Sequence, residues 1–469
     1  MKQAIGYYWT DYRFRLMTWR HILVLMLKVG PVKMLRLLFR YPWMVTLLKA
    51  NRLHKKLCTG RPPAYHKATA MVINGAVAGF TNMLGPVFRY PDRVIINQDM
   101  VPPEIFHAMG LAPFMAELNG IMLPMIDPHV MEDYIDTSEN RGIPPDICSL
   151  PKSTMGLFMK GEVPPAKAIV TSNLPCDGGM SSYTVMENLL QLPTFRLDIP
   201  NDVNTPKAPA YFREELKRMI QWLEAHTPGR MDWDRLREIC EERNRMVEAE
   251  LELWEMLRVR PAPLAAEAMY LSHLWYFNLF PGHPDATRTI RRIVDLGREN
   301  LEAKIPAVAP EKYRALLWNP PLLHFIDLFN WAEKAYGVSL IMDSMSFNRL
   351  PYIDTATRDT MLEGIGRNIM NGPMARHTRG PADNYLDDIF YIRKHFDIDM
   401  LWVAGHIGCK NTQAMNGILR EKCREAGLPL LIINYDLSDP RVVSREAIIE
   451  QVNHFMENIM QAKRQDISA

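Results

Sequence analysis

The sequence predicts an α/β protein with two parallel-sheet α/β domains, a mainly helical domain inserted between them and an N-terminal helical arm. Three observations support this prediction. In two separate regions, short apolar runs typical of buried parallel strands alternate with loops and helical segments. The stretch between those regions has helical periodicity alone. At 469 residues, the chain is also too long for a single hydrophobic core.

Residues 1–69 are expected to form the arm. Its apolar run is interrupted about once per helical turn by the basic residues Lys28, Lys33, Arg36 and Arg40. No apolar stretch within residues 1–57 reaches the ~20 residues that cross a bilayer, and no signal-peptide cleavage site follows. We expect a basic amphipathic arm packed on the body or on a partner, with a helix lying on a membrane surface as the alternative.

Residues 70–205 are expected to form the first α/β domain. Segments rich in Val, Ile and Ala predict strands over 70–79, 93–97 and 167–171. Pro102 and Pro103 predict the start of a helix that ends near Gly110, because proline is well tolerated in the first helical turn. A further helix is expected from Ser181 onward.

Residues 206–310 are expected to form the helical domain. Apolar periodicity predicts helices over 213–225, 233–259, 264–279 and 285–302. Asp232 and Asp285 are placed as N-caps, since a short carboxylate can accept the unpaired amides of a first helical turn.

Residues 311–469 are expected to form the second α/β domain. Strands are predicted over 315–318, 338–342, 399–404 and 430–433. Helices are predicted after Pro320-Pro321, from about Thr412, and over 445–460. The repeated alternation suggests that the two α/β units are topological relatives.

Composition excludes some classes of function. A net charge of +2 gives no reason to expect nucleic-acid binding. Only 6 cysteines in a chain of this length do not form a disulfide framework, which favours a reduced, cytoplasmic setting. The Gly364-Ile-Gly366 segment lacks a third glycine at the required spacing and no Walker-type lysine motif occurs, so ATP binding by this chain is not expected.

Three cysteines lie in polar loops instead of apolar stripes. Cys148 follows a proline-rich segment, Cys176 precedes Gly178-Gly179, and Cys409 follows Gly408. Ligands of parallel sheets bind beyond the carboxyl ends of strands, where Cys176 and Cys409 are expected. We interpret the three as a metal site, most consistent with an iron–sulfur cluster that has one open iron. Their wide spacing leaves unrelated loop cysteines as the alternative, and Cys58, Cys240 and Cys423 are interpreted as non-ligands.

At these residues the chain resembles the 2-hydroxyacyl-CoA dehydratase/benzoyl-CoA reductase family. The similarity extends from about residue 95 to the end. The matching segments are Val101-Pro-Pro-Glu-Ile, Ala108-Met-Gly110, Asp146-Ile-Cys-Ser149, Ser172-Asn-Leu-Pro-Cys-Asp177, Gly408-Cys-Lys410, Gly427-Leu-Pro-Leu-Leu-Ile and Asp436…Asp439-Pro-Arg441.

The resemblance implies a [4Fe–4S] cluster bound by Cys148, Cys176 and Cys409. It further implies a homologous cluster-bearing partner subunit, a separate ATP-hydrolysing iron–sulfur activator and an acyl-CoA substrate that accepts single low-potential electrons. The arm and the segment His406-Ile-Gly-Cys-Lys are most similar to the large cluster-bearing subunit of ATP-dependent benzoyl-CoA reductase. That enzyme reduces an aromatic acyl-CoA ring to a cyclic diene in anaerobic aromatic degradation. A 2-hydroxyacyl-CoA dehydratase subunit acting through a ketyl radical, and a non-redox acyl-CoA-binding scaffold, are the alternatives.

Two further residues are interpreted as catalytic. Glu104 matches a family carboxylate and could relay a proton, or simply complement a helix dipole. His406 could donate a proton to a reduced ring or bond to the edge of the cluster, or serve as a structural histidine. Lys410 and Arg441 are weaker candidates for the phosphates of coenzyme A, and Asp177 is a candidate N-cap.

Overall fold

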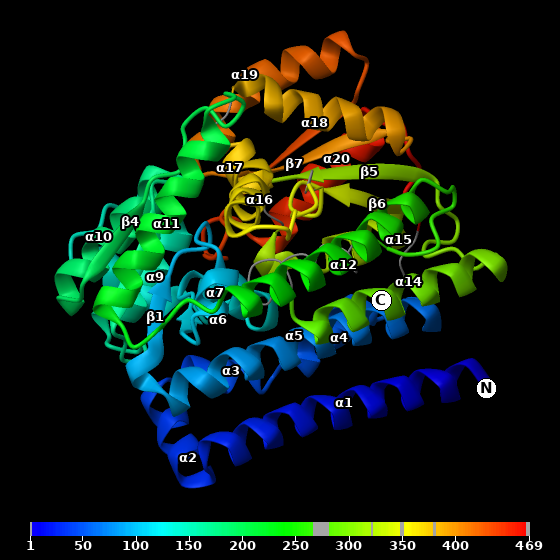
Figure 1. Ribbon diagram of the computed structural model, residues 1–469. Coiled ribbons are helices and arrows are strands. Elements are labelled where there is room, and N and C mark those ends of the chain that lie inside the picture. Colours follow the sequence, from blue (N-terminus) through cyan, green and yellow to red (C-terminus); the bar gives the residue numbers. More distant parts are fainter. Residues whose placement is uncertain (1, 266–280, 320–321, 348–350, 379–380, 466–469) are drawn as a thin grey trace.

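Two parallel four-stranded sheets lie at the centre of the fold, which confirms the predicted α/β class (Figure 1). The computed structural model describes residues 2–265, 281–319, 322–347, 351–378 and 381–465. Most strands are short and almost fully buried, because helices cover the faces of the parallel sheets. The edge strands at Thr194–Leu197 and Leu430–Tyr435 are partly exposed.

The first sheet has the strand order β2-β1-β3-β4. Its elements are β1 (Val94–Asn97), α6 (Pro103–Ala108), β2 (Ala112–Phe114), α7 (Glu117–Ile126), α8 (Glu132–Asn140), α9 (Ser149–Met159), β3 (Ala168–Ser172), α10 (Asp177–Leu190) and β4 (Thr194–Leu197). The predicted strands at 93–97 and 167–171 and the helix after Pro102 are confirmed.

The second sheet repeats this order as β6-β5-β7-β8. Its elements are β5 (Tyr313–Trp318), η2 (Leu323–Phe325), α15 (Leu328–Tyr336), β6 (Val338–Asp343), α16 (Arg358–Asn371), α17 (Pro373–Arg376), α18 (Ala382–His395), β7 (Met400–His406), α19 (Lys410–Glu425), β8 (Leu430–Tyr435) and α20 (Arg445–Asn458). The two units therefore share one topology, as the repeated sequence alternation suggests. Each sheet has a topological switch point, where successive connections leave in opposite directions. It lies between β1 and β3 in the first sheet and between β5 and β7 in the second.

Between the sheets the chain is helical in its described part, with α11 (Ala208–His226), α12 (Trp233–Leu257) and α14 (Pro284–Glu302). Asp232 caps α12 by accepting the amide hydrogen of Arg235 at 2.9 Å, as predicted. The N-cap of α14 is His283 and not Asp285, because the His283 ring accepts the Asp285 amide hydrogen. The predicted helix at 264–279 lies largely outside the described residues.

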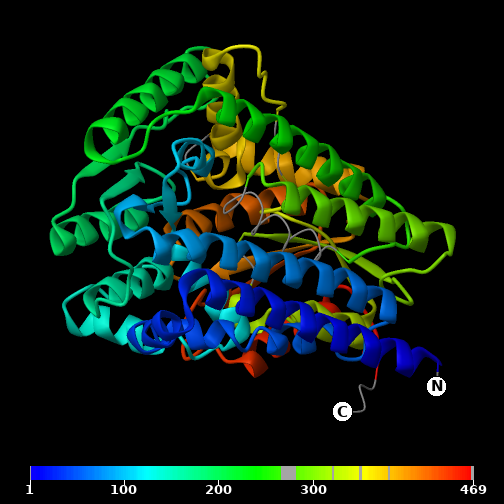
Figure 2. The same cartoon turned by 60° about the horizontal axis from the view of Figure 1, so that its bottom comes forward.

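The arm comprises α1 (Lys2–Val29), α2 (Pro31–Arg40), α3 (Trp43–Leu47) and α4 (Asn51–Cys58), followed by α5 (Pro63–Arg89) and the short η1 (Pro91–Arg93). Figure 1 shows these helices as a layer beneath the sheets, and Figure 2 turns that layer toward the viewer. Helix α1 packs along α5, as expected for an arm on the body of the protein.

The strand predicted at 70–79 is wrong, because these residues lie in the middle of α5. Val72, Ile73, Ala76 and Phe80 are buried at helical spacing, and Pro63 starts the helix. The predicted boundary between the arm and the first α/β domain, at residues 69 and 70, therefore falls inside α5. The stretch Ala64–Arg89 is long and apolar enough to span a membrane, with mean hydropathy 1.3, but 56% of its most apolar window is buried in the structure. A helix in the core of a protein has the same length, apolar composition and burial.

Candidate functional site

Each of the three predicted cysteines is the N-cap of a helix. Cys148 precedes α9, Cys176 precedes α10 and Cys409 precedes α19. Cys176 follows β3 and Cys409 follows β7. The two cysteines therefore occupy equivalent positions at the topological switch points of the two sheets. Crevices at such switch points are where open parallel sheets bind ligands.

The fold brings the three cysteines together from both units. The thiols at Cys176 and Cys409 lie close enough to Cys148 for their charges to act on its titration. A Cβ atom on Gly408 would lie only 2.9 Å from the Cα atom of Cys148, so glycine permits this close backbone approach. Segments 260 residues apart in the chain therefore meet in one site.

A loop after β8 fastens the Cys148 segment to the second unit. The Ser438 amide donates to the Ser149 hydroxyl at 3.1 Å, and the Ser438 hydroxyl donates to the carbonyl of Gly120 at 3.0 Å. Ser438 and Ser149 are fully or almost fully buried. These bonds cross between the two α/β units, and they hold the start of α9 against the end of the second sheet.

His406, the last residue of β7, contacts the Cys148 thiol directly. Its Nδ1 accepts the amide hydrogen of Leu437 at 3.1 Å, which places the ring proton on Nε2. Nε2 lies 3.0 Å from Cys148 Sγ and donates to it. Burial lowers the pKa of His406, and the nearby Asp436 carboxylate offsets this only in part. The neutral ring therefore acts as a hydrogen-bond donor to sulfur.

The surroundings of the thiols combine burial with backbone donors. Burial raises the pKa of Cys148 well above its ordinary value and also raises that of Cys176, while the helix-start amides of Leu150 and Gly179 act in the opposite direction. The Gly179 amide lies 3.4 Å from Cys176 Sγ, and the Thr412 hydroxyl donates to Cys409 Sγ at 3.2 Å. Sulfurs in this setting become thiolates when a bound cation supplies the missing positive charge.

Three thiols presented at helix starts are a donor set compatible with an iron–sulfur cluster. Among the described residues, these three sulfurs do not form a group whose ligand atoms all lie within 4.8 Å of one another. A cuboidal cluster of several irons separates its thiolates more widely than one ion does, and thiolates are its usual ligands. Cys148, Cys176 and Cys409 are the residues that could hold it.

A pair of acidic residues beside Cys176, buried Glu117 and half-buried Asp99, was not predicted from the sequence. The Asp99 amide donates to Glu117 Oε2 at 3.3 Å, and the Glu117 carboxyl acts on the titration of Cys176. Burial raises the pKa of Asp99 to about 6 and raises that of Glu117 well above its ordinary value, with the Asp99 charge adding to the second effect. Asp99 lies two residues beyond β1. An acidic residue just after a parallel strand is the sequence feature that could have predicted its place near the site.

Glu104 lies elsewhere in the structure. It is 1% exposed in the first turn of α6 and forms a buried ion pair with Arg243 of α12. Burial lowers the pKa of Arg243 to about 10. No hydrogen bond or ion pair joins Glu104 to the three thiols within the described part of the chain. The pair holds α6 against α12, and a catalytic role for Glu104 stays a prediction.

The weaker sequence candidates have varied positions. Arg441 binds the carboxylates of Asp136 and Asp439 at 2.8–3.1 Å, so its guanidinium is already engaged. Lys410 is exposed in the first turn of α19. Asp177 is the first residue of α10 and not its N-cap, since the Cys176 sulfur takes that role.

The remaining cysteines lie apart from this site. Cys240 and Cys423 are buried within α12 and α19, and burial raises the pKa of these thiols to about 12 and about 11. Cys58, at the end of α4, lies beside His54 and His66. Cys240 and Cys423 are thus placed as expected for cysteines that bind no metal, whereas Cys58 lies in a group of metal-ligand side chains, which the sequence interpretation did not foresee.

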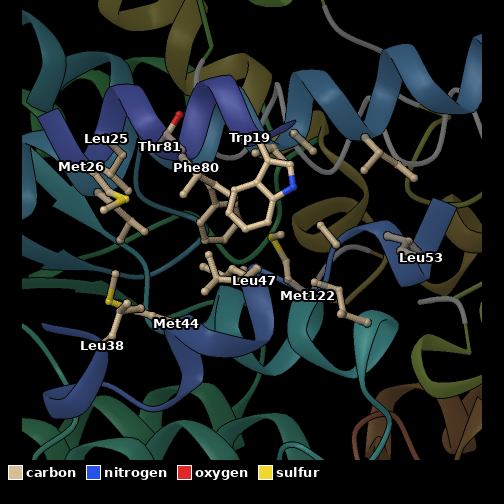
Figure 3. Close-up of a pocket in the computed structure, with 18 of the residues that line it drawn as sticks. Trp19, Leu25, Met26, Leu38, Met44, Leu47, Leu53, Phe80, Thr81 and Met122 are labelled. Atoms are coloured by element: carbon tan, nitrogen blue, oxygen red, sulfur yellow. The ribbon is translucent and has the colours of Figure 1, made fainter. Parts of the chain in front are cut away.

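An apolar cavity of about 150 Å³ lies among the helices of the arm, between α1, α2, α3, α4, α5 and α7 (Figure 3). Trp19, Phe80 and Met122 line it, and Thr81 is its one residue with a polar side-chain group other than the Trp19 ring. None of the three site cysteines lines this cavity. It belongs to the packing of the arm and not to the site between the sheets.

Comparisons with known proteins agree with the similarity noted in the sequence. Residues 98–459 match the family described as 2-hydroxyglutaryl-CoA dehydratase, D-component. Lactoyl-CoA dehydratase subunit alpha of Anaerotignum propionicum is 21% identical over 381 residues, covering 75% of this chain and 87% of that subunit. A benzoyl-CoA reductase subunit of Thauera aromatica is 20% identical over 349 residues, covering 70% of this chain and 79% of that subunit. The chain belongs to the 2-hydroxyglutaryl-CoA dehydratase D-component family.

Proposed function

We propose that this chain binds one [4Fe–4S] cluster through Cys148, Cys176 and Cys409 and, as one subunit of a heteromeric enzyme, passes single electrons to an acyl-CoA thioester. The observation that carries this is the convergence of three helix N-cap thiols from two sheets of identical topology. When bound, the cluster supplies one-electron chemistry at low potential and one iron without a protein ligand.

The chain's own residues support that role in three ways. The helix-start amides and the Nε2 proton of His406 donate to the thiolates, which stabilises their negative charge. Gly408 permits the approach of the Cys148 backbone to the loop after β7. Ser438 holds the two units in register around the site.

The lead function is a subunit of an ATP-dependent benzoyl-CoA reductase. Reduction of an aromatic ring by two electrons also consumes two protons, so the site needs a proton supply that excludes bulk water. Asp99 and Glu117, whose pKa values are raised by burial beside Cys176, suit such a supply. The match to a benzoyl-CoA reductase subunit supports the same direction.

The second candidate is a subunit of a 2-hydroxyacyl-CoA dehydratase. The match to a lactoyl-CoA dehydratase subunit covers larger shares of both chains than the reductase match does. Elimination of water is neutral in electrons overall, so the electron that starts the reaction is recovered. The two reactions therefore share an electron-entry step and differ in what becomes of the electron.

The proposed partners follow from this chemistry. A homologous cluster-bearing subunit would complete the heteromer, and a separate ATP-hydrolysing iron–sulfur activator would supply the electrons. The setting would be cytoplasmic and anaerobic, which keeps thiols reduced and low-potential electrons away from oxygen.

The deciding experiment combines the purified heteromer with its activator, reductant and ATP under anaerobic conditions. A reductase consumes ATP in fixed proportion to the cyclic diene formed from an aromatic thioester. A dehydratase uses ATP only catalytically while releasing water from a 2-hydroxyacyl thioester. If neither thioester reacts while both still bind, the non-redox scaffold is the better description.

A further inference from the structure

A second set of metal-ligand side chains lies in the arm, where α4 meets α5. His54 and Cys58 are one helical turn apart on α4, and His66 lies in the first turn of α5. One ligand atom from each residue lies within 4.8 Å of the other two. The side chains are 2%, 0% and 1% exposed, so the group is enclosed by the protein.

The ligand types and spacing suit a zinc-class ion. Imidazole nitrogen and thiolate sulfur are the common protein ligands of Zn²⁺, and residues four apart on a helix present their side chains to the same point. In a tetrahedral zinc site, ligand atoms lie about 3.3–3.7 Å apart, as follows from its bond lengths. The ligand atoms here lie within 4.8 Å of one another, so each pair would have to approach by at most about 1 Å to reach 3.7 Å.

Neighbouring residues orient the two imidazoles as in metal sites. His66 Nε2 lies 3.1 Å from the carbonyl oxygen of Arg61, to which it donates, and Nδ1 is then the ring nitrogen that can act as ligand. Metal-binding histidines commonly donate their second ring proton to a backbone carbonyl in this way. The His54 ring stacks on Phe14 with centroids 4.4 Å apart, which fixes its plane.

Arg61, whose carbonyl oxygen accepts from His66, has its guanidinium engaged by other side chains. Arg61 forms an ion pair with Glu333 at 2.8 Å, and its guanidinium lies 3.9 Å above the Tyr65 ring. The Glu333 carboxylate offsets its charge in this buried region. One thiolate and two neutral imidazoles would in turn neutralise half of the charge of a divalent ion.

We infer that His54, Cys58 and His66 bind one Zn²⁺ ion that fastens α4 to the start of α5. Helix α4 also closes one side of the apolar cavity through Leu53 (Figure 3). Asn330 of α15 donates to the carbonyls of Lys56 and Thr59, so the same corner joins the arm to the second unit. The role of the ion is structural, and it stands apart from the cluster and from acyl-CoA chemistry.

The test uses the full-length chain with Cys148, Cys176 and Cys409 all replaced by Ser, which removes the proposed cluster ligands. Zinc is measured by mass spectrometry, and the stripped protein is then titrated with Co²⁺. We expect about one bound ion per chain and the charge-transfer absorption of a cobalt–thiolate bond. Because this background lacks the cluster ligands, the result does not depend on the proposed function.

Cys58→Ser in the same background should lose the cobalt–thiolate absorption and at least ~10-fold in affinity, a loss typical of weakening a metal's ligand set. Cys240→Ser, which changes an equally buried cysteine outside the group, should keep both. Chelation should lower the melting temperature of the Cys240→Ser protein and leave that of the Cys58→Ser protein unchanged. A folded background protein that shows no cobalt–thiolate absorption, or that binds copper only, would overturn the assignment.

Discussion

Replacement of Asp99 by Asn should make the protein more stable at neutral pH. Asp99 is half-buried beside Glu117, with one oxygen of its carboxyl group enclosed by the protein. The backbone amide of Asp99 donates to Glu117, and the substitution retains this bond. Asn has nearly the same shape as Asp and carries no charge at any pH. It therefore removes the cost of holding a carboxylate in this buried position.

The magnitude follows from the pKa of Asp99, which burial raises from 3.8 to about 6. A carboxyl that is harder to ionise in the folded protein stabilises the fold at low pH, and this contribution is lost as pH rises through about 4–6. For a rise of the pKa from 3.8 to about 6, the full loss is about 3 kcal/mol. Between pH 5 and pH 7.5, where measurement is practical, the wild-type protein should lose about 1.4 kcal/mol that the Asp99→Asn protein keeps.

The assay is urea unfolding of the anaerobic chain at pH 5.0, 6.0 and 7.5, values chosen to bracket the pKa near 6. Asp177→Asn serves as the control, because Asp177 is an exposed carboxylate one residue from Cys176. The control should retain the wild-type dependence on pH. If Asp99→Asn also retains it, or is less stable than wild type at pH 7.5, burial of an ionised Asp99 is not the cause.

Three further outcomes are expected. Cys176→Ala should lose bound iron and acid-labile sulfide, whereas Cys240→Ala should retain wild-type iron; equal iron in the two would contradict the ligand assignment. His406→Leu should lower the reduction potential of the cluster by tens of millivolts, and at most by about 130 mV, because a hydrogen bond to a charged acceptor contributes about 1.5–3 kcal/mol. His406→Gln keeps a hydrogen-bond donor, so its potential should lie between those of the wild type and His406→Leu. Redox titration monitored by EPR distinguishes the three proteins. Glu104→Gln should destabilise the fold by about 1–3 kcal/mol, because buried Arg243 loses one of the two carboxylates that act on it and keeps Glu250. The iron content should stay at the wild-type level, and loss of iron with unchanged stability would instead favour a role at the site.

Much of the fold could be predicted because parallel strands and amphipathic helices leave different periodicities. The strands before Cys176 and Cys409 were located from their apolar runs, and the loops after them from glycine and polar residues. The strand predicted at 70–79 failed for a related reason. A buried helix that is apolar over most of its surface resembles a buried strand over ten residues, and only the full length from Pro63 distinguishes them.

The site was harder to predict in full because its geometry depends on tertiary contacts. That Cys148 meets His406 is fixed by the close approach at Gly408 and by the bonds of Ser438, none of which appears as a local pattern. The pairing of Glu104 with Arg243 likewise joins helices far apart in the sequence. Sequence reasoning can propose such residues, but their partners follow only from the packing of the two units.

The cluster itself can be tested by one measurement on the anaerobically purified chain: its iron and acid-labile sulfide content, taken together with EPR of the reduced protein. We expect about four irons and four sulfides per chain and the signal of a reduced [4Fe–4S] cluster, both lost on replacing Cys148, Cys176 or Cys409 by Ala. A folded wild-type chain that contains no iron, or that keeps its full iron content after these replacements, would contradict the proposal.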